Sequence, residues 1–330
     1  MKTAAVIRPY YPPGKKLAED EEDTLDQTRL ISSALKNLGY KVKELQCTLN
    51  FEKLRKELVK LNPAFCFNLV EDIEDSSSLC VAVALLLEHI KMPVAGSPSS
   101  ALYLSTHKPA AKAFMQYRGI PTPVFFFEGS SGGNLAFPAQ YIIKPECEDA
   151  SIGIDHDSLI QAENLSDLQH KIKQREDLIE KKCFAEEFIN GREINISIIA
   201  DNGSYEILPP AEILFIDFPA DKPKILDYEA KWCYDSFACR NTPRSFKFDS
   251  TDQKMLERAQ KLAMQAFKIY GCRGYARIDF RADESELYVI ETNANPCLAE
   301  ECGLIASAAQ RGYSYDDVIK RIVSDIPGIS

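Results

Sequence analysis

The chain has 330 residues, a formal net charge of −10, and 45% hydrophobic residues. This length predicts two or three domains, with a core large enough to fold without disulfide staples. The acidic balance argues against a nucleic-acid partner or a membrane surface, and the longest apolar run, residues 79–87, is too short to span a bilayer.

The ten cysteines are scattered along the chain and include no CxxC pair, so a zinc ribbon or a redox pair is not expected. The N-terminus has only a short apolar run before Arg8, shorter than a signal peptide requires. Together these features predict a cytoplasmic protein whose thiols are reduced.

Strands and helices alternate through the first unit, residues 1–105. Hydrophobic patterning predicts strands at 3–8, 41–45, 64–70 and 93–95 and helices at 24–38, 51–61 and 77–90. Asp23 is the expected N-cap of the first helix, and Gly39 lies where a glycine would follow its end. The alternation predicts a doubly wound parallel sheet with helices on both faces.

The second unit, residues 106–187, mixes shorter elements. A helix is expected at 108–118, where Gly119 and Pro121 end it, and another at 166–175. Strands are expected at 123–127, 141–145 and 183–187, and the glycine-rich stretch 129–134 is interpreted as a flexible turn.

The third unit, residues 188–330, holds the longer strands. They are expected at 193–200, 205–215, 275–281 and 287–293, with an amphipathic helix at 251–270. Runs of strands with few helices favour an antiparallel sheet. The fold class is therefore α/β and α+β: an N-terminal doubly wound domain followed by two α+β units, with clefts between them that could bind ligands.

The strongest chemical signal comes from the last two strands. Along the strand at 275–281, Arg277 and Asp279 alternate with apolar residues, and Glu291 and Asn293 likewise share one face of their strand. A hairpin centred near Glu284 would place Arg277 opposite Glu291, with Asp279 on the same face.

Two carboxylates and an amide oxygen on one face are hard ligands that suit magnesium, and the neighbouring arginine could contact a phosphate or a developing oxyanion. The same alternation is also typical of a solvated sheet face with ordinary cross-strand ion pairs. Glu291 favours the metal site, because it ends an apolar strand and is not followed by a charged loop.

Candidate phosphate ligands lie in the second unit. Lys144 ends a strand, and Lys108 begins a helix, where a bound anion would explain a cation facing the positive end of the helix dipole. Residues 146–155 could form a mobile loop over a ligand. Either lysine could equally be a solvated surface residue, and the loop a plain surface turn.

The stretch 183–198 offers groups for a nucleotide. Backbone groups of residues 187–189 could bind an adenine edge, and Glu193 could accept from ribose hydroxyls, although an ordinary hairpin with surface acids has the same pattern. The sequence contains no GxxxxGK[ST], GxGxxG or GxSxG motif, so it has no P-loop, dinucleotide fingerprint or nucleophile elbow.

Many segments in order resemble the ATP-grasp superfamily and, within it, the D-alanine–D-alanine ligases. The resemblance runs from about residue 65 to 320. It is carried by FNLVED, ALLLEHIKMPVAGSPSSALYLSTHK, GIPTP, YIIKP, EDASIGI, EEFINGREINI, DYEAKW, GCRGYARIDFR and ETNANPCL. The order of so many segments is far more specific than any one of them.

This resemblance implies ATP and two magnesium ions as cofactors, with manganese as an alternative metal. It also implies a role for each matching residue. The nucleotide contacts would be Lys108, Lys144, Glu186, Glu187, Phe188, Ile189, Glu193 and Lys231; the metal ligands Asp279, Glu291 and Asn293; and the catalytic residues Arg277, Lys231 and Ser151, with the backbone near Gly303 helping to hold the oxyanion.

The sequence departs from the family pattern on the amino-acid side. The family's Gly-Gly-x-Ser-x-Glu segment after the first strand is replaced by RPYYPPGKKLAEDEED. The serine pair of the closing loop is Ala150-Ser151, Trp232 replaces a tyrosine, and His107 replaces an aspartate. The ATP half matches and the amino-acid half does not, so we expect a substrate other than D-alanine.

The resulting hypothesis is an ATP-dependent ligase that forms an amide or peptide bond between a small carboxylate, expected to be an amino acid, and an amine through an acyl phosphate, releasing ADP and phosphate. The resemblance also implies a homodimer as one possible assembly. Two alternatives stay open from the residues: a non-catalytic nucleotide-binding protein on the same fold, and a carboxylate kinase or ATPase that uses the same site.

Overall fold

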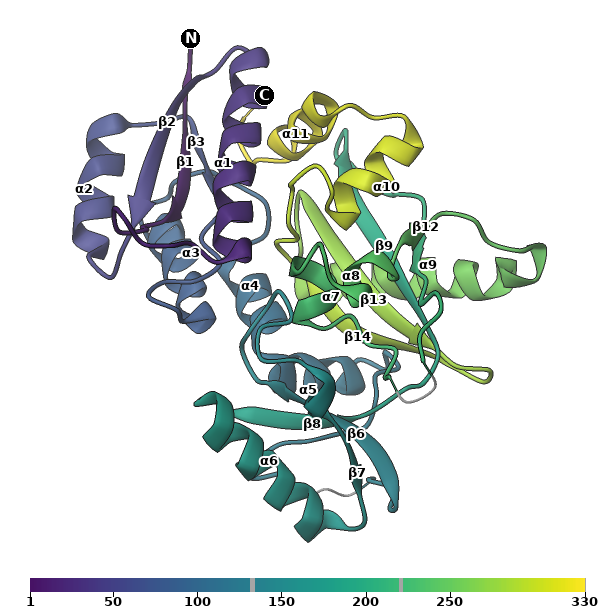
Figure 1. The fold of residues 1–330 in the computed structure, drawn as a ribbon. Helices are drawn as coiled ribbons and strands as arrows, with labels where there is room; N and C mark the ends of the chain where they lie inside the picture. Colours follow the sequence, from purple (N-terminus) through teal and green to yellow (C-terminus); the bar gives the residue numbers. More distant parts are fainter. Residues whose placement is uncertain (131–133, 220–221, 330) are drawn as a thin grey trace.

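The computed structural model describes residues 1–130, 134–219 and 222–329, and the middle of the turn predicted at 129–134 lies outside these ranges. The elements form three sheets (Figure 1). The strands of the first lie between Thr3 and Ala95, those of the second between Phe125 and Glu187, and those of the third between Arg192 and Asn293. The division of the chain at residues 105 and 187 stays a prediction.

The first sheet is parallel, with strand order β2-β1-β3-β4. Its elements are β1 (Thr3–Pro9), α1 (Glu19–Asn37), β2 (Lys41–Cys47), α2 (Phe51–Leu61), β3 (Phe65–Asn68), α3 (Cys80–His89) and β4 (Val94–Ala95). Alternate residues of β1 pack on opposite sides: Val6 against α1, and Ile7 against α2 and α3. The predicted doubly wound sheet is confirmed.

The first helix begins earlier than predicted. It starts at Glu19, with Ala18 rather than Asp23 at the N-cap, and the Glu21 carboxylate accepts a hydrogen bond from the Ala18 amide at 3.0 Å. Four consecutive acidic residues, 19–22, form the first turn, where the helix dipole favours negative charge. Because that turn is not apolar, hydrophobic periodicity does not reveal it.

The second sheet is antiparallel, with order β5-β8-β6-β7. It is entered through α4 (Ser99–Thr106) and α5 (Lys108–Tyr117). Its strands are β5 (Phe125–Phe126), β6 (Ala139–Pro145), β7 (Leu159–Ala162) and β8 (Cys183–Glu187). Helix α6 (Leu165–Ile179) covers one face through Leu168 and Ile172.

The third sheet has the order β12-β11-β9-β13-β14, and β10 pairs with β9. The strands are β9 (Arg192–Asp201), β10 (Ser204–Ile207), β11 (Ala211–Ile213), β12 (Arg244–Ser245), β13 (Tyr275–Ala282) and β14 (Leu287–Asn293). The single strand predicted at 205–215 is wrong: it is broken at Pro209-Pro210, which have no amide hydrogens for a ladder.

Helix α9 (Gln253–Tyr270) packs its alanine-rich stripe on the apolar face of this sheet, against residues such as Ile196 and Ile278. The opposite face therefore carries the polar side chains of β9 and β13. The short helices α7 (Tyr228–Trp232) and α8 (Phe237–Arg240) lie in the β11–β12 connection, and α10 (Gly303–Arg311) and α11 (Tyr315–Ser324) follow the sheet.

Helix α11 packs against α1 and the first sheet, which joins the end of the chain to its beginning. The mixed architecture, one parallel sheet followed by two antiparallel ones, is the fold class predicted from the sequence. Among the described residues, no helix is both long and apolar enough to cross a membrane.

Candidate active site

One cavity of about 480 Å³ is lined by every residue that the sequence singles out for nucleotide, metal or catalysis. These are Lys108, Lys144, Ser151, Glu186, Glu187, Phe188, Ile189, Glu193, Lys231, Arg277, Asp279, Glu291 and Asn293. They come from the second and third sheets and the loops between them, so the fold brings them together from distant parts of the chain. Their individual roles stay predictions.

The β13–β14 hairpin has a different register from the predicted one. Asp279 lies opposite Glu291, and Arg277 lies opposite Asn293 rather than Glu291. A bulge between Asp279 and Phe280 leaves Ile290 without a partner on β13, and this extra residue was not visible in the alternation. Because the cross-strand partner moves by two residues, the charged side chains keep their common face.

Asp279 is buried and fully engaged on that face. Arg277 donates to it from Nε and Nη2, both at 2.8 Å, and Asn195 Nδ2 donates at 2.7 Å. Burial opposes the Arg277 charge, but the Asp279 carboxylate outweighs it and raises the arginine's pKa. The carboxylate therefore lies in a cavity wall rather than on a solvated sheet surface.

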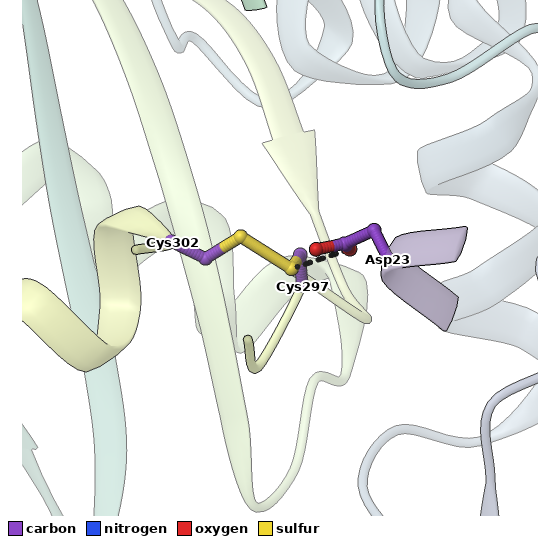
Figure 2. Close-up of side chains that lie close together, drawn as sticks. All are labelled: Asp23, Cys297 and Cys302. Atoms are coloured by element: carbon purple, nitrogen blue, oxygen red, sulfur yellow. Dashed lines mark hydrogen bonds between the residues drawn. A yellow bond between two sulfur atoms is a disulfide. The ribbon is translucent and has the colours of Figure 1, made fainter. Parts of the chain in front are cut away.

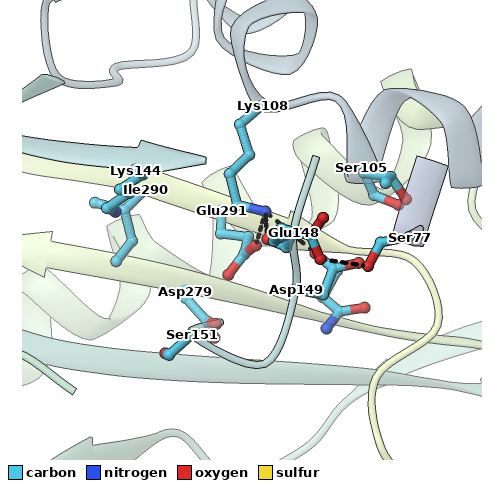
Figure 3. A network of polar contacts seen from close by, with 12 residues as sticks. Ser77, Ser105, Lys108, Lys144, Glu148, Asp149, Ser151, Asp279, Ile290 and Glu291 are labelled. Atoms are coloured by element: carbon cyan, nitrogen blue, oxygen red, sulfur yellow. Dashed lines mark hydrogen bonds and ion pairs between the residues drawn. The ribbon is translucent and has the colours of Figure 1, made fainter. Parts of the chain in front are cut away.

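Glu291 lies beside Lys108, which begins α5 (Figure 3). Lys108 Nζ is 3.4 Å from Glu291 Oε1 and 3.2 Å from Asp149 Oδ1, and it donates to the Glu148 carbonyl oxygen at 2.5 Å. Burial raises the pKa of Glu291, but Lys108 and Lys231 outweigh burial and lower it. The carboxylate is therefore ionised in a strongly cationic setting.

The donor set fits a hard divalent cation. Asp279 and Glu291 are directly opposed on neighbouring strands, and Asn293, on the same face of β14, adds an amide oxygen. Each carboxylate pairs with a protein cation, Asp279 with Arg277 and Glu291 with Lys108, so these pairs hold both in the cavity wall. Carboxylate and amide oxygens are the ligands that magnesium prefers.

A buried cluster of Lys112, Glu186 and Lys144 forms the wall nearest α5. The Glu186 carboxylate pairs with both lysines, at 2.5 Å from Lys144 Nζ, and Lys112 also donates to the Ile290 carbonyl oxygen at 3.1 Å. Burial raises the pKa of Glu186, but the two lysines outweigh it and lower it. Glu186 thus positions Lys144, and its side chain is not free for an adenine ring.

Sequence reasoning missed Lys112, although a signal exists. It lies four residues after Lys108 and therefore on the same face of the helix. A lysine there, flanked by alanines on a half-apolar helix, could have been read as a second cavity cation.

The stretch proposed for adenine and ribose is held by the protein's own contacts. Glu187 N donates to the Val124 carbonyl oxygen and Phe188 N to that of Gln140. Glu193 forms an ion pair of 2.8 Å with Arg281, whose guanidinium lies over the Phe188 ring. Two of the three backbone amides proposed to bind adenine therefore already donate within the protein. Glu193 lines the cavity as the partner of Arg281 in an ion pair.

The loop at 146–155 is fastened to the segment around α7. Ser151 Oγ donates to the Leu226 carbonyl oxygen at 2.8 Å, and Trp232 Nε1 donates to that of Ala150 at 2.9 Å. Lys231 lies in the same wall, where burial and the nearby Arg277 lower its pKa. The loop covers one side of the cavity, as expected for a closing segment.

The other end of the cavity was not predicted. Asp20, Asp23 and Glu71 add acidic groups to its lining, and Arg244 of β12 adds a guanidinium. Glu71 belongs to the FNLVED segment but was given no role there, and Asp20, Asp23 and Arg244 stand in none of the matching segments.

Cys297 and Cys302 form a disulfide in this region, which corrects the expectation of reduced thiols for this pair (Figure 2). Their sulfurs and the Asp23 carboxylate lie within 4.8 Å of one another. Because both sulfurs are bonded, they offer no thiolate for a metal. The two cysteines lie five residues apart, a spacing wider than that of a CxxC pair.

Comparison with known proteins places this cavity in context. The family described as "D-ala D-ala ligase C-terminus" matches residues 130–324. The D-alanine–D-alanine ligase of Carboxydothermus hydrogenoformans is 29% identical over 320 residues, 93% of this chain and 94% of that protein. The enzyme of the same name from Aquifex aeolicus is 27% identical, covering 93% of this chain and 97% of that one.

The crystal structure of the D-alanine–D-alanine ligase of Bacillus anthracis complexed with ATP superposes with a TM-score of 0.71 at 20% identity, covering 98% of this chain and 97% of that one. The fold is therefore that of the ATP-grasp ligases. With the family match over more than half of its length, the chain belongs to the D-alanine–D-alanine ligase family of the ATP-grasp superfamily.

Proposed function

We propose that this protein is an ATP-dependent ligase that joins a small carboxylic acid to an amine through an acyl phosphate, releasing ADP and phosphate. The observation that carries the proposal is a single cavity in which the acids of β13 and β14 face the lysines of the second sheet and of α7. A scaffold that did not turn over ATP would have no need for so many buried, opposed charges.

The cations of the cavity are placed to handle phosphate. Lys108, Lys144 and Lys231 would neutralise the triphosphate and hold it for in-line attack by an oxygen of the substrate carboxylate. The bond between the γ-phosphorus and the bridging oxygen breaks, and ADP leaves. Two magnesium ions, or manganese, held by Asp279, Glu291 and Asn293 would supply further charge neutralisation at the phosphates.

The second step joins the amine. Its nitrogen attacks the acyl carbon, the carbon–oxygen bond to phosphate breaks, and the nitrogen loses a proton. Arg277 lies between Asp279 and the start of α10, where it can stabilise the oxyanion that forms. The loop around Ser151 would exclude water, which would otherwise hydrolyse the acyl phosphate.

We further propose that the acid is not D-alanine. The segment between β1 and α1 lacks the family's Gly-Gly-x-Ser-x-Glu pattern, and Asp20 and Asp23 of α1, which follows it, line the cavity. Two acids at this end favour a substrate with a cationic group. We also propose that the chain divides into three domains at residues 105 and 187 and that the cavity lies where they meet. The assembly to be tested is a homodimer.

The test is a screen of acid and amine pairs with magnesium-ATP, in which ADP, phosphate and amide product are all measured. A ligase releases ADP only when both partners are present and forms amide in equal amount. ADP release with the acid alone, and no amide, would indicate a kinase or ATPase instead. Binding of ATP without any turnover would indicate a nucleotide-binding protein.

Asp279→Asn supplies the matched variant. We expect it to lower kcat by at least about 100-fold, because one charge-bearing metal oxygen is lost while the side chain keeps its shape. Glu284→Gln is the control, since this acid is exposed at the turn of the same hairpin and outside the cavity. Full activity in Asp279→Asn would show that Asp279 is not a metal ligand.

A further inference from the structure

Arg244 is a cavity arginine to which the ligase chemistry above assigns no role. It lies on β12, the edge strand of the third sheet, where it pairs with Ile213 of β11. Its side chain is partly buried in the cavity wall. Burial and the neighbouring Arg277 both lower its pKa, so a second charged guanidinium at this place reduces the stability of the folded protein.

The hydrogen bonds of Arg244 leave one edge of the guanidinium open. Nη1 donates to the Glu301 carbonyl oxygen at 3.1 Å. Its Nε is buried and has no hydrogen-bond partner in the described part of the chain. Arg277 differs, because its Nε and Nη2 both bind Asp279. A buried arginine nitrogen without a partner is costly, so a ligand group that accepts from it is expected.

The open edge faces the start of α10. A Cβ atom placed on Gly303 would lie 3.7 Å from Arg244 Nη2, 3.9 Å from its Nε and 3.5 Å from Arg277 Cδ. Gly303 is the first residue of α10, and the N-cap residue Cys302 makes no side-chain capping bond. The glycine keeps this space clear, and both the free edge and the helix start present hydrogen-bond donors to it.

We propose that Arg244 is a specificity-determining residue that binds a carboxylate on a substrate, one that does not itself react. This inference rests on the ligase function proposed above. The Nε–Nη2 edge of a guanidinium matches the two oxygens of a carboxylate, and such bidentate pairs are strong and directional.

The charge distribution favours a carboxylate over a phosphate of the nucleotide. The three lysines proposed for the triphosphate lie around Glu291 and Glu186. Arg244 instead lies beyond Arg277, on the side of Gly303 and Glu301. With Asp20 and Asp23 also lining the cavity, a substrate that carries both an ammonium and a spare carboxylate would find a partner for each charge.

The experiment uses the active pair from the substrate screen. Each partner that carries a non-reacting carboxylate is compared with its primary amide, in wild type, Arg244→Gln, Arg244→Lys and the control Arg240→Gln. Arg240 is exposed in α8, close in sequence and outside the cavity lining. The readouts are kcat and KM for each substrate, and circular dichroism to verify folding.

We expect wild type to prefer the carboxylate over the amide by about 30- to 100-fold in kcat/KM, mostly through KM. Arg244→Gln should lose this preference, because its KM for the carboxylate substrate rises towards that for the amide. Arg244→Lys, which keeps the charge without the fork, should retain part of it. If the preference appears when the acid is varied, Arg244 binds a non-reacting carboxylate of the acid. If it appears when the amine is varied, Arg244 binds a carboxylate of the amine.

The outcomes separate this inference from the proposed function. A wild type that ligates a pair without any spare carboxylate, or an Arg244→Gln that folds and still prefers the carboxylate, overturns the role of Arg244 and leaves the ligase intact. A wild type that turns over no pair refutes the ligase itself.

Discussion

Individual charged residues in the cavity are balanced by one another. Lys112 and Lys144 share Glu186, Lys108 contacts Glu291, and Arg277 forks onto Asp279. Burying a charge without a partner costs several kcal/mol, so these pairs stabilise the fold around the cavity and hold the side chains in place. Arg244, described above, departs from this rule.

Glu71 is a second departure, because it has acidic rather than basic neighbours. It lines the cavity, and burial together with the nearby Asp149 and Asp23 raises its pKa to about 8. The folded protein therefore holds a proton at Glu71 that the unfolded chain gives up near its ordinary pKa of 4.5. The stability linked to this proton is present below pH 4.5 and is lost as the pH rises through about 8.

We predict that Glu71→Gln removes this pH dependence. The variant should gain on wild type by about 1–2 kcal/mol between pH 5.5 and pH 9, a figure reduced for the partial exposure of the side chain. Urea unfolding at several pH values measures it. Glu74→Gln, an exposed acid three residues along, should run parallel to wild type. If the unfolding free energy of Glu71→Gln also follows that of wild type at every pH, Glu71 is ionised in the folded protein.

Residue-scale prediction from the sequence succeeded where a residue stands in a recognisable segment. Asp279, Glu291 and Lys144 each stand in a strand that belongs to a matching segment, and all line the cavity. Lys112 and Arg244 belong to no such segment, and Glu71, although it stands in FNLVED, was given no role there. They become cavity residues only when distant parts of the chain pack together. The local patterns of a single sequence do not reveal contacts between residues so far apart in the chain.

At the scale of elements, strand and helix periods located most of the long segments. Helix α2 and strands β8 and β14 begin and end where predicted. The misses have local causes: a first turn without apolar residues in α1, and a Pro-Pro break between β10 and β11. The short β7 and β12 are too brief to show a period, and α10 follows a loop whose cysteines gave no helix signal.

The turn between β8 and β9 packs closely against the end of β13. Gly191 lies there, and a Cβ atom added to it would be 1.9 Å from the Ala282 carbonyl oxygen at the end of β13. Arg281 Nη1 also donates to the Gly191 carbonyl oxygen at 3.1 Å. The backbones can approach this closely only because residue 191 has no side chain.

We predict that Gly191→Ala destabilises the protein by about 2–4 kcal/mol, since a backbone carbonyl must move to relieve the contact. Gly203→Ala is the matched control: its φ is +84°, and nothing lies within 4 Å of the added Cβ atom, so only backbone strain of about 1 kcal/mol is expected. Urea unfolding compares the two. An equal loss of unfolding free energy in the two variants would show that the β8–β9 turn can move away from β13 without destabilising the protein.

At the scale of the whole molecule, the cavity is built from all three sheets. Asp20 and Asp23 reach it from the first unit, Lys144 and Glu186 from the second, and Asp279 from the third. The sequence predicted clefts between units, and the order of family segments indicated which residues would meet. Neither could show that α1 enters the wall, because its acidic start carries no periodic signal.

Magnesium-ATP should therefore act as a clamp across the second and third units. We predict that saturating magnesium-ATP raises Tm by several degrees, because a ligand at about 100 times its Kd adds about 2.7 kcal/mol to the folded state. It should also change the fluorescence of Trp232, the only tryptophan, whose Nε1 binds the Ala150 carbonyl oxygen of the covering loop.

Lys144→Met should lose most of the Tm shift, while Lys60→Met, an exposed lysine on α2, should keep it. Adding EDTA to remove magnesium should reverse the shift in the wild-type protein, because the phosphates would then face Asp279 and Glu291 without a cation between them. A Tm shift that survives both EDTA and Lys144→Met would place the nucleotide away from these acids and this lysine.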